Sequence, residues 1–155
     1  MLIVGELINT SRKAVHAAVE NQDAAFIQEL AVQQVQAGAH YVDVNAGTFV
    51  GEEAEKLCWL VKTVQEKVES PLALDTPDPE ALRQALALHR GKALINSITG
   101  EEERWAAMLP VVAQAGASVI ALCLDDAGMP LIGGGPVAGG GQAGPGTRAC
   151  RSSPP

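Results

Sequence analysis

The sequence predicts an α/β fold built around a parallel β-sheet. Short apolar runs that fit buried strands alternate with longer stretches that carry apolar residues at helical spacing. Four of the strand-like runs end in a polar residue, which is Asn9, Asn45, Asp75 or Asn96. Because parallel strands with right-handed crossovers place their carboxyl ends along one edge of the sheet, we expect these side chains to gather there.

Two helices are expected between the first two strands. The first strand is expected at about residues 2–5, before a polar turn at residues 9–11 and a short helix. Asp23 is a suitable N-cap for the second helix, which is expected to end at Gly38. Residues 41–45 have the β-branched character of a strand that is covered on both faces.

The next two helices show both an apolar face and a start signal. A helix with Leu57 and Val61 on its buried face is expected after the second strand. The third strand is expected at residues 72–75. Asp78 and Pro79 then supply the N-cap and the first-turn proline of the following helix.

The last elements are a fourth strand, a helix and a fifth strand. The fourth strand is expected at residues 93–95, and three successive glutamates at residues 101–103 favour a helix N-terminus through the helix macrodipole. That helix is expected to end at Gly116 and to be followed by a strand at residues 118–124. Its inward-facing side chains are expected to be Trp105, Met108, Leu109 and Val112.

The composition changes abruptly at residue 132. Residues 1–131 contain all 18 acidic and nine of the 11 basic residues, and we predict that they form the folded domain. Residues 132–155 contain eight of the 16 glycines and four of the nine prolines, without helical or strand periodicity. We therefore predict a disordered tail there. Because another helix is expected at this point, a frameshifted or prematurely ended reading frame is a hypothesis.

The composition also excludes several classes of function. A formal net charge of −7 argues against a nucleic-acid surface. No apolar run approaches the ~20 residues of a membrane span, and the opening residues do not resemble a signal peptide, so a cytoplasmic protein is expected. Cys58, Cys123 and Cys150 lack metal-ligand spacing, so we expect neither a metal site nor a disulfide framework.

The polar residues at the expected strand ends suit a planar, amide-rich ligand such as a pterin. A carboxylate can accept two N–H bonds side by side, and a carboxamide can both donate and accept. Asp43, Asn45, Asp75 and Asn96 supply these groups. Each of them alone would more often cap a helix or stabilise a turn than bind a ligand. Four such residues in successive units favour a binding site.

Other polar residues give weaker signals. Glu6 and Asn9 fall at the end of the first strand, where Glu6 could either face a ligand or anchor the loop. His16, His40 and His89 have no acidic partner at triad or metal spacing, and His16 and His89 are expected on helix surfaces. The sequence pattern identifies no catalytic residue.

Several short segments carry a family resemblance. Residues 5–9 read Gly-Glu-Leu-Ile-Asn, residues 43–47 read Asp-Val-Asn-Ala-Gly, and Leu-Asp-Thr and Ile-Asn-Ser stand at residues 74–76 and 95–97. With residues 128–130, these segments resemble the pterin-binding methyltransferases, and specifically the methyltetrahydrofolate:corrinoid/iron-sulfur protein methyltransferases. The resemblance covers about residues 1–131.

The resemblance implies a TIM-barrel-type (β/α)8 fold, of which about the first five βα units are present, and usually a homodimer. It implies that the N5 methyl group of methyltetrahydrofolate moves to a cob(I)alamin carried by a separate corrinoid/iron-sulfur protein or another corrinoid protein. The pterin-binding residues that it implies are Asp75 and Asn96, with Asp43 and Asn45 lining the same pocket and Glu6 and Asn9 at the first strand end.

The sequence also departs from the family pattern. Leu7 stands where the family usually has an arginine, and nothing from residue 132 onward resembles the three further βα units, which supply another aspartate and asparagine. Two alternatives therefore stay open. One is a dihydropteroate synthase-like pterin enzyme, although residues 46–49 lack that family's Ser/Thr-Arg-Pro run. The other is a non-catalytic fragment whose unpaired strand edges favour association.

Overall fold

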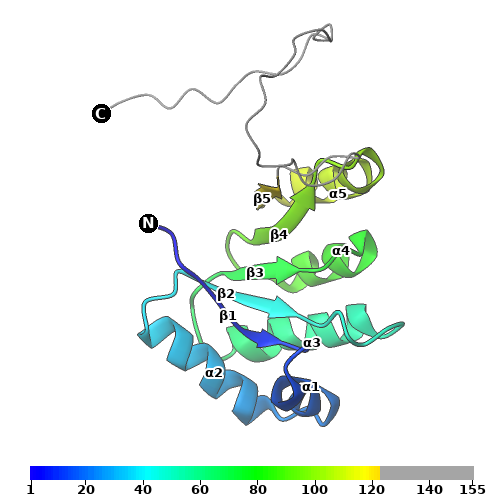
Figure 1. The fold of residues 1–155 in the computed structure, drawn as a ribbon. Coiled ribbons are helices and arrows are strands. Elements are labelled where there is room, and N and C mark those ends of the chain that lie inside the picture. Colours follow the sequence, from blue (N-terminus) through cyan, green and yellow to red (C-terminus); the bar gives the residue numbers. More distant parts are fainter. Residues whose placement is uncertain (123–155) are drawn as a thin grey trace, which may run out of the picture.

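The computed structural model describes residues 1–122 (Figure 1). The expectations for Cys123, Cys150, residues 123–124 of the fifth strand, residues 128–130 and the tail at 132–155 lie outside this part of the chain. Within it, no helix is long and apolar enough to cross a membrane. In chain order the elements are β1 (Val4–Asn9), α1 (Lys13–Glu20), α2 (Ala24–Gln36), β2 (Tyr41–Asn45), α3 (Glu53–Gln65), β3 (Leu72–Asp75), α4 (Pro79–Leu88), β4 (Leu94–Thr99), α5 (Glu102–Ala115) and β5 (Ser118–Leu122).

The five strands form one parallel sheet whose spatial order, β1-β2-β3-β4-β5, is the order of the chain. Each helix contacts the next along the chain, and the helices lie along one side of the sheet (Figure 1). This arrangement confirms the predicted α/β fold with a parallel sheet. It is also consistent with part of a TIM-barrel-type fold, in which sequential parallel strands alternate with outer helices.

Local sequence signals set the starts of α2 and α4 and the ends of α2 and α5. Asp23 and Asp78 each accept a hydrogen bond from a backbone N–H in the first turn of α2 and α4, as N-caps do. Gly38 lies just beyond α2 with a φ of +98°, and Gly116 ends α5 with a φ of +62°. A residue with a β-carbon rarely adopts this left-handed conformation, so glycine allows the chain to leave each helix.

The hydrophobic core lies between the sheet and the helices. Val42 and Val44 of β2 are fully buried, and they alternate with Asp43 and Asn45, which therefore face the other side of the sheet. Burying one such aliphatic side chain contributes about 1.5–3 kcal/mol. The other large side chains that are fully buried are Ile8, Val19, Ile27, Leu57, Leu60, Val61, Leu72, Leu74, Leu82 and Ile95.

Two strands differ from the prediction. β1 begins at Val4 and continues to Asn9, and its register with β2 shifts between Gly5 and Ile8. The expected strand at residues 2–5 was therefore placed too early. At the shift, the backbone N–H of Leu7 donates to Oε1 of Gln34 in α2 at 2.8 Å, so a side chain replaces a strand partner. The second correction is that β4 continues past residue 96 to Thr99, with a similar shift in register.

The prediction that α5 directs four side chains inward was correct for Met108 and Val112, which are buried, and wrong for Trp105 and Leu109. The latter two are each 40% exposed. Within residues 1–122, no element packs on this side of α5. With Leu122 and other residues of β4 and β5, Trp105 and Leu109 line an apolar cleft of about 230 Å³.

His89 was expected on a helix surface, and this was wrong. It follows α4 directly and is half-buried, with Nε2 accepting a hydrogen bond from the Leu72 N–H at 3.0 Å. Burial lowers the pKa of the imidazole, which favours the neutral form that can accept this bond. The ring therefore secures the start of β3 to the end of α4.

Candidate functional site

Four predicted site residues meet in two hydrogen-bonded pairs on the face of the sheet opposite the helices. Nδ2 of Asn45 donates to Oδ2 of Asp75 at 2.9 Å, and Nδ2 of Asn96 donates to Oδ2 of Asp43 at 2.9 Å. The first pair joins register partners at the ends of β2 and β3. The second pair reaches from β4 to β2. The four side chains are therefore one contiguous polar group, as predicted from the strand ends.

Asp75 and Asn96 line the same hollow, which has a volume of about 290 Å³. This volume lies at the lower end of the range for small-molecule pockets, about 300–1,000 Å³. Arg104 of α5 also lines the hollow, and its Nε lies 3.0 Å from Oε2 of Glu101. The remaining lining residues are Thr76, Pro77, Ser97, Ile98, Thr99, Met108 and Leu122.

The environment of Asp43 brings the pKa of its carboxyl group close to neutral pH. Burial raises its pKa to about 7, although the hydrogen bond from Asn96 opposes the shift. The negative charges of Asp75 and Glu6 raise it further. A group with a pKa near the working pH can both give and take a proton.

The pKa of Asp75 is also raised, chiefly by burial. The hydrogen bond from Asn45 lowers it, and the charges of Glu6 and Glu53 raise it. Strongly perturbed carboxyl groups in a hollow are typical of functional sites. The structure therefore concentrates negative charge where the resemblance places a ligand.

Glu6 and Asn9 behave differently from the four paired residues. Glu6 is exposed, but its charge influences both Asp43 and Asp75, so it lies beside the polar group. Asn9 turns towards its own loop, where Oδ1 accepts a hydrogen bond from the Ser11 N–H at 2.9 Å. This contact is the turn-stabilising role that Asn commonly has.

Two buried threonines support the site, and the sequence reasoning missed both. Thr10 is 2% exposed, and its Oγ1 donates to Oδ1 of Asn45 at 3.4 Å. Thr76 is 1% exposed and donates to a carboxylate oxygen of Glu53 at the start of α3. Each threonine directly follows a polar strand-end residue, and this pairing was the available sequence signal.

The loop between β2 and α3 is held beside the site by an aromatic cluster. The His16 ring stacks on Phe49 with centroids 4.3 Å apart, and Nδ1 of His16 lies 2.9 Å from Oγ1 of Thr48. Nζ of Lys56 lies 5.6 Å from the centroid of the Phe49 ring. His16 therefore lies partly exposed on the surface of α1, as expected, and packs on Phe49.

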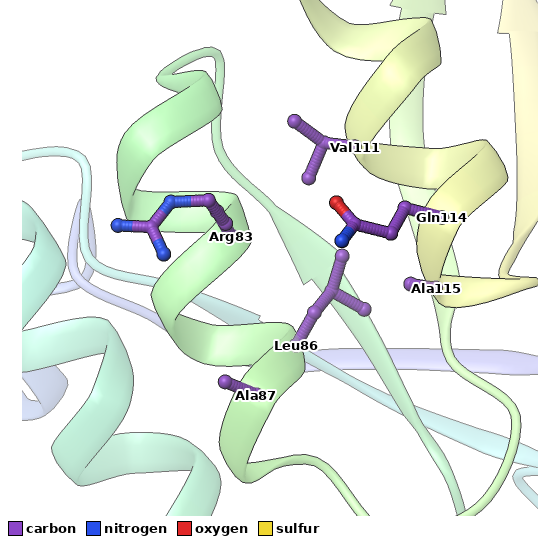
Figure 2. Close-up of a pocket in the computed structure, with 6 residues that line it drawn as sticks. All are labelled: Arg83, Leu86, Ala87, Val111, Gln114 and Ala115. Atoms are coloured by element: carbon purple, nitrogen blue, oxygen red, sulfur yellow. The ribbon is translucent and has the colours of Figure 1, made fainter.

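A second cavity of about 300 Å³ lies between α4 and α5 (Figure 2). Leu86, Val111 and Gln114 line it, and Figure 2 shows the Arg83 guanidinium extending away from Val111 and Gln114. Arg83 instead pairs with Glu80 on its own helix. The cavity lies among the outer helices, apart from the strand ends, so the hollow at Asp75 and Asn96 is the better candidate site.

Comparison with known proteins gave one family and several relatives. The sequence matches the family described as "Pterin binding enzyme" over residues 5–131. It is 41% identical over 132 residues to the methylcorrinoid:tetrahydrofolate methyltransferase of Eubacterium limosum, an alignment that covers 84% of this chain and 49% of the relative.

More distant similarity links the chain to two methionine synthases. The protein from Mycobacterium tuberculosis is 27% identical over 134 residues, and that from Mycobacterium leprae is 28% identical over 138 residues. Each alignment covers 83% of this chain and 11% of the relative. The chain thus spans about half the length of the Eubacterium relative and a small part of the methionine synthases.

Proposed function

The chain belongs to the pterin-binding enzyme family, and from this premise we propose that its strand-end hollow binds the pterin ring of a folate. We propose further that it serves methyl transfer between N5 of methyltetrahydrofolate and the cobalamin of a partner corrinoid protein. One observation carries the proposal: Asp75 and Asn96 line one hollow, and each is hydrogen-bonded to another polar strand residue.

The free hydrogen-bonding positions of the two pairs fit a pterin. Oδ2 of Asp75 accepts a hydrogen bond from Asn45, so Oδ1 is left to accept one from an N–H of the ring. Asn96 donates to Asp43 through Nδ2, so its Oδ1 can accept and its second amide hydrogen can donate. In this proposal Asp75 and Asn96 contact the pterin, Asp43 and Asn45 hold them in place, and Glu6 and Asn9 lie at the rim.

The chemistry requires a proton at N5. When a methyl group leaves a tertiary amine, the electron pair of the C–N bond returns to nitrogen, and a proton or strong hydrogen bond must stabilise it. Asp43, whose pKa is raised to about 7, does not contact the ring in this proposal, so it can influence N5 only through its hydrogen bond to the Asn96 side chain. Alignment of the two reactants is the second contribution expected of the protein.

The same site can serve either direction of transfer. The resemblance implies folate as methyl donor, whereas the name of the Eubacterium relative makes tetrahydrofolate the acceptor. Forward and reverse transfer share one transition state, so a proton that reaches N5 in one direction leaves it in the other. The concentrations and potentials of the partners would decide the net direction.

Binding of folate to the purified chain tests the proposal. Asp75→Asn should weaken tetrahydrofolate binding about tenfold or more, because it replaces a charged acceptor by a group that is half donor. Asp23→Asn is the matched control, since asparagine caps a helix as well as aspartate does and position 23 lies on α2. Titration calorimetry measures both. Equal affinity of both variants, or no binding by the unmodified chain, would contradict the proposed site.

Methyl transfer itself is tested with free cob(I)alamin and methyltetrahydrofolate, followed by absorbance. A chain that binds folate without transfer would support the alternative of a non-catalytic binding fragment. The apolar cleft beside β5 is the observation that favours this alternative most directly. Condensation with para-aminobenzoate would instead indicate a dihydropteroate synthase-like enzyme.

Partner, location and domain boundary belong to the same proposal. We propose a corrinoid protein as partner, a homodimer in the full-length family, and a cytoplasmic location. We also propose that the domain ends near residue 131 and that residues 132–155 form a separate tail. Light scattering with and without a corrinoid protein, cell fractionation, and limited proteolysis with mass spectrometry test these four points.

A further inference from the structure

We propose that Thr10 is a positioning residue for the candidate site: its hydroxyl sets the orientation of the Asn45 carboxamide, so that Nδ2 faces Asp75. This inference deepens the proposed function and rests on it for the identity of the ligand. The orientation itself follows from the hydrogen bonds around Asn45. It is therefore open to a test that needs no substrate.

The contacts of Thr10 allow only one direction for its hydroxyl proton. Oγ1 of Thr10 accepts from the Thr48 backbone N–H at 3.4 Å and lies 3.4 Å from the side chain of Asn45. A backbone N–H can only donate, and a hydroxyl has one proton. That proton is therefore directed at Asn45, which must present an acceptor.

The backbone N–H of Gly47 is a second donor to the end of the Asn45 amide that Thr10 contacts. The Gly47 N–H lies 3.0 Å from Oδ1 of Asn45. Two donors that converge on one end can be satisfied only by the carbonyl oxygen, so the NH₂ group must lie at the other end. There it donates to Oδ2 of Asp75 at 2.9 Å and to the Asp75 backbone carbonyl at 3.2 Å. Rotating the amide by a half turn would reverse all four contacts.

Burial makes the hydroxyl of Thr10 hard to replace. The residue is 2% exposed, so water has little access to the group. Its backbone is held separately, because the Thr10 N–H donates to the Asn45 carbonyl at 3.2 Å and the Thr10 carbonyl accepts from Oγ1 of Thr48. Valine would keep the backbone contacts and the shape of the side chain and would remove only the hydroxyl.

The orientation of the Asn45 amide affects the carboxylate of Asp75. An amide fixed by Thr10 and Gly47 supplies a constant N–H to Oδ2, which leaves Oδ1 for a ligand. This N–H also stabilises the charged carboxylate against the effect of burial. Without the hydroxyl of Thr10, the amide is held by Gly47 alone at its oxygen end, and its contact with Asp75 should weaken.

The test compares Thr10→Val with Thr10→Ser, which keeps the hydroxyl. Thr63→Val is the matched control, because Thr63 is also buried but lies in α3, away from the strand ends. NMR of side-chain amides reports the Asn45 NH₂ group, and carbon-detected titration reports the pKa of Asp75. We expect Thr10→Val to move the Asn45 signals and raise the Asp75 pKa, and the other two variants to match the unmodified chain. Unchanged Asn45 signals and an unchanged titration in Thr10→Val would overturn the proposal.

Folate binding is the second measurement, and it separates this inference from the proposed function. Thr10→Val should bind tetrahydrofolate about three- to tenfold more weakly, the effect of about one hydrogen bond. Altered NMR signals with unchanged affinity would overturn the positioning role of Thr10 towards the ligand. If the unmodified chain binds no folate, the proposed function fails, and the amide and titration data still decide whether Thr10 orients Asn45.

Discussion

Asp43 shows how a single residue gains its properties from its surroundings. Its position in β2 follows from the sequence, since it alternates with two buried valines. Its raised pKa does not follow from the sequence. The burial of the carboxyl group and the nearby charges of Asp75 and Glu6 arise only when three strands come together. The places of the four paired residues at strand ends could be predicted from the sequence, and their role as a binding site stays a prediction. Thr10 and Thr76 each follow such a strand-end residue, but the sequence does not show their hydrogen-bond partners, which lie on other elements.

The pH dependence of stability should report the Asp43 pKa. Its folded pKa of about 7 exceeds the ordinary value of 3.8, so between these values the folded state binds more protons than the unfolded state. The protonated carboxyl group of Asp43 therefore makes its full contribution to the stability of the fold below pH 3.8. This contribution is lost as the pH rises towards 7. Asp43→Asn removes the free-energy cost of ionising a buried carboxyl group at higher pH. Its carboxamide oxygen still accepts the hydrogen bond from Asn96. We expect it to raise the free energy of unfolding by about 1–3 kcal/mol at pH 8 and to change it little near pH 4.

Urea denaturation at the two pH values measures this difference. Asp78→Asn is a suitable control, because Asp78 caps α4 and asparagine can take over that role. A difference between Asp43→Asn and the unmodified chain that is the same at pH 4 and pH 8 would contradict the assigned pKa.

For helices and strands, predictions that depend on adjacent residues were correct, whereas predictions that depend on contacts with distant parts of the chain were wrong. The bounds of β2 and β3 and the caps of α2 and α4 were predicted correctly, because each depends on residues adjacent in the chain. The extent of β1 was wrong because its irregular register depends on Gln34, which lies in α2. The orientation of Trp105 was wrong because it depends on what packs against α5.

The contact between β1 and α2 leads to a prediction at Gly5. A β-carbon added there would lie 2.6 Å from Oε1 and 3.1 Å from Cβ of Gln34. Moving Gln34 aside would remove its hydrogen bond to the Leu7 N–H. Gly5→Ala should therefore destabilise the fold by about 1–3 kcal/mol, a typical cost of overpacking. Thermal or urea unfolding measures it.

Gly47→Ala is the control for this experiment. A β-carbon at Gly47 would meet its nearest neighbour, Oδ1 of Asn45, at 3.5 Å, which is ordinary van der Waals contact. We expect this variant to unfold at nearly the same denaturant concentration as the unmodified chain. If Gly5→Ala were equally stable, β1 and α2 would not be in the close contact that the structure shows.

For the molecule as described by residues 1–122, the most distinctive feature is an apolar side at β5 that no other element of these residues covers. Trp105, Leu109, Val119 and Leu122 are each about two-fifths exposed there, and β5 pairs only with β4 among residues 1–122. The sequence predicted the five strands in their chain order, but it did not predict which side chains would lie exposed beside β5. An apolar patch beside a free strand edge favours association between molecules.

A charge within this patch should reduce self-association. We expect Leu109→Lys to lower the apparent mass at high protein concentration, with little change in stability, because the residue is already 40% exposed. Val50→Lys is the control, since Val50 is 94% exposed and lies in the loop before α3. Light scattering over a concentration series measures both. Equal association of the two variants would show that molecules meet elsewhere.

The bond between Asn96 and Asp43 links two strands that are not neighbours in the sheet. It passes over β3, although two strand spacings amount to about 9.6 Å. Asp43 is paired in register with Ala73, whose small side chain leaves the space above the middle strand open. The two side chains together bridge this distance across β3. The bond therefore ties β2 to β4, and the part of the sheet face that we propose to bind a ligand is held together by contacts among these three strands.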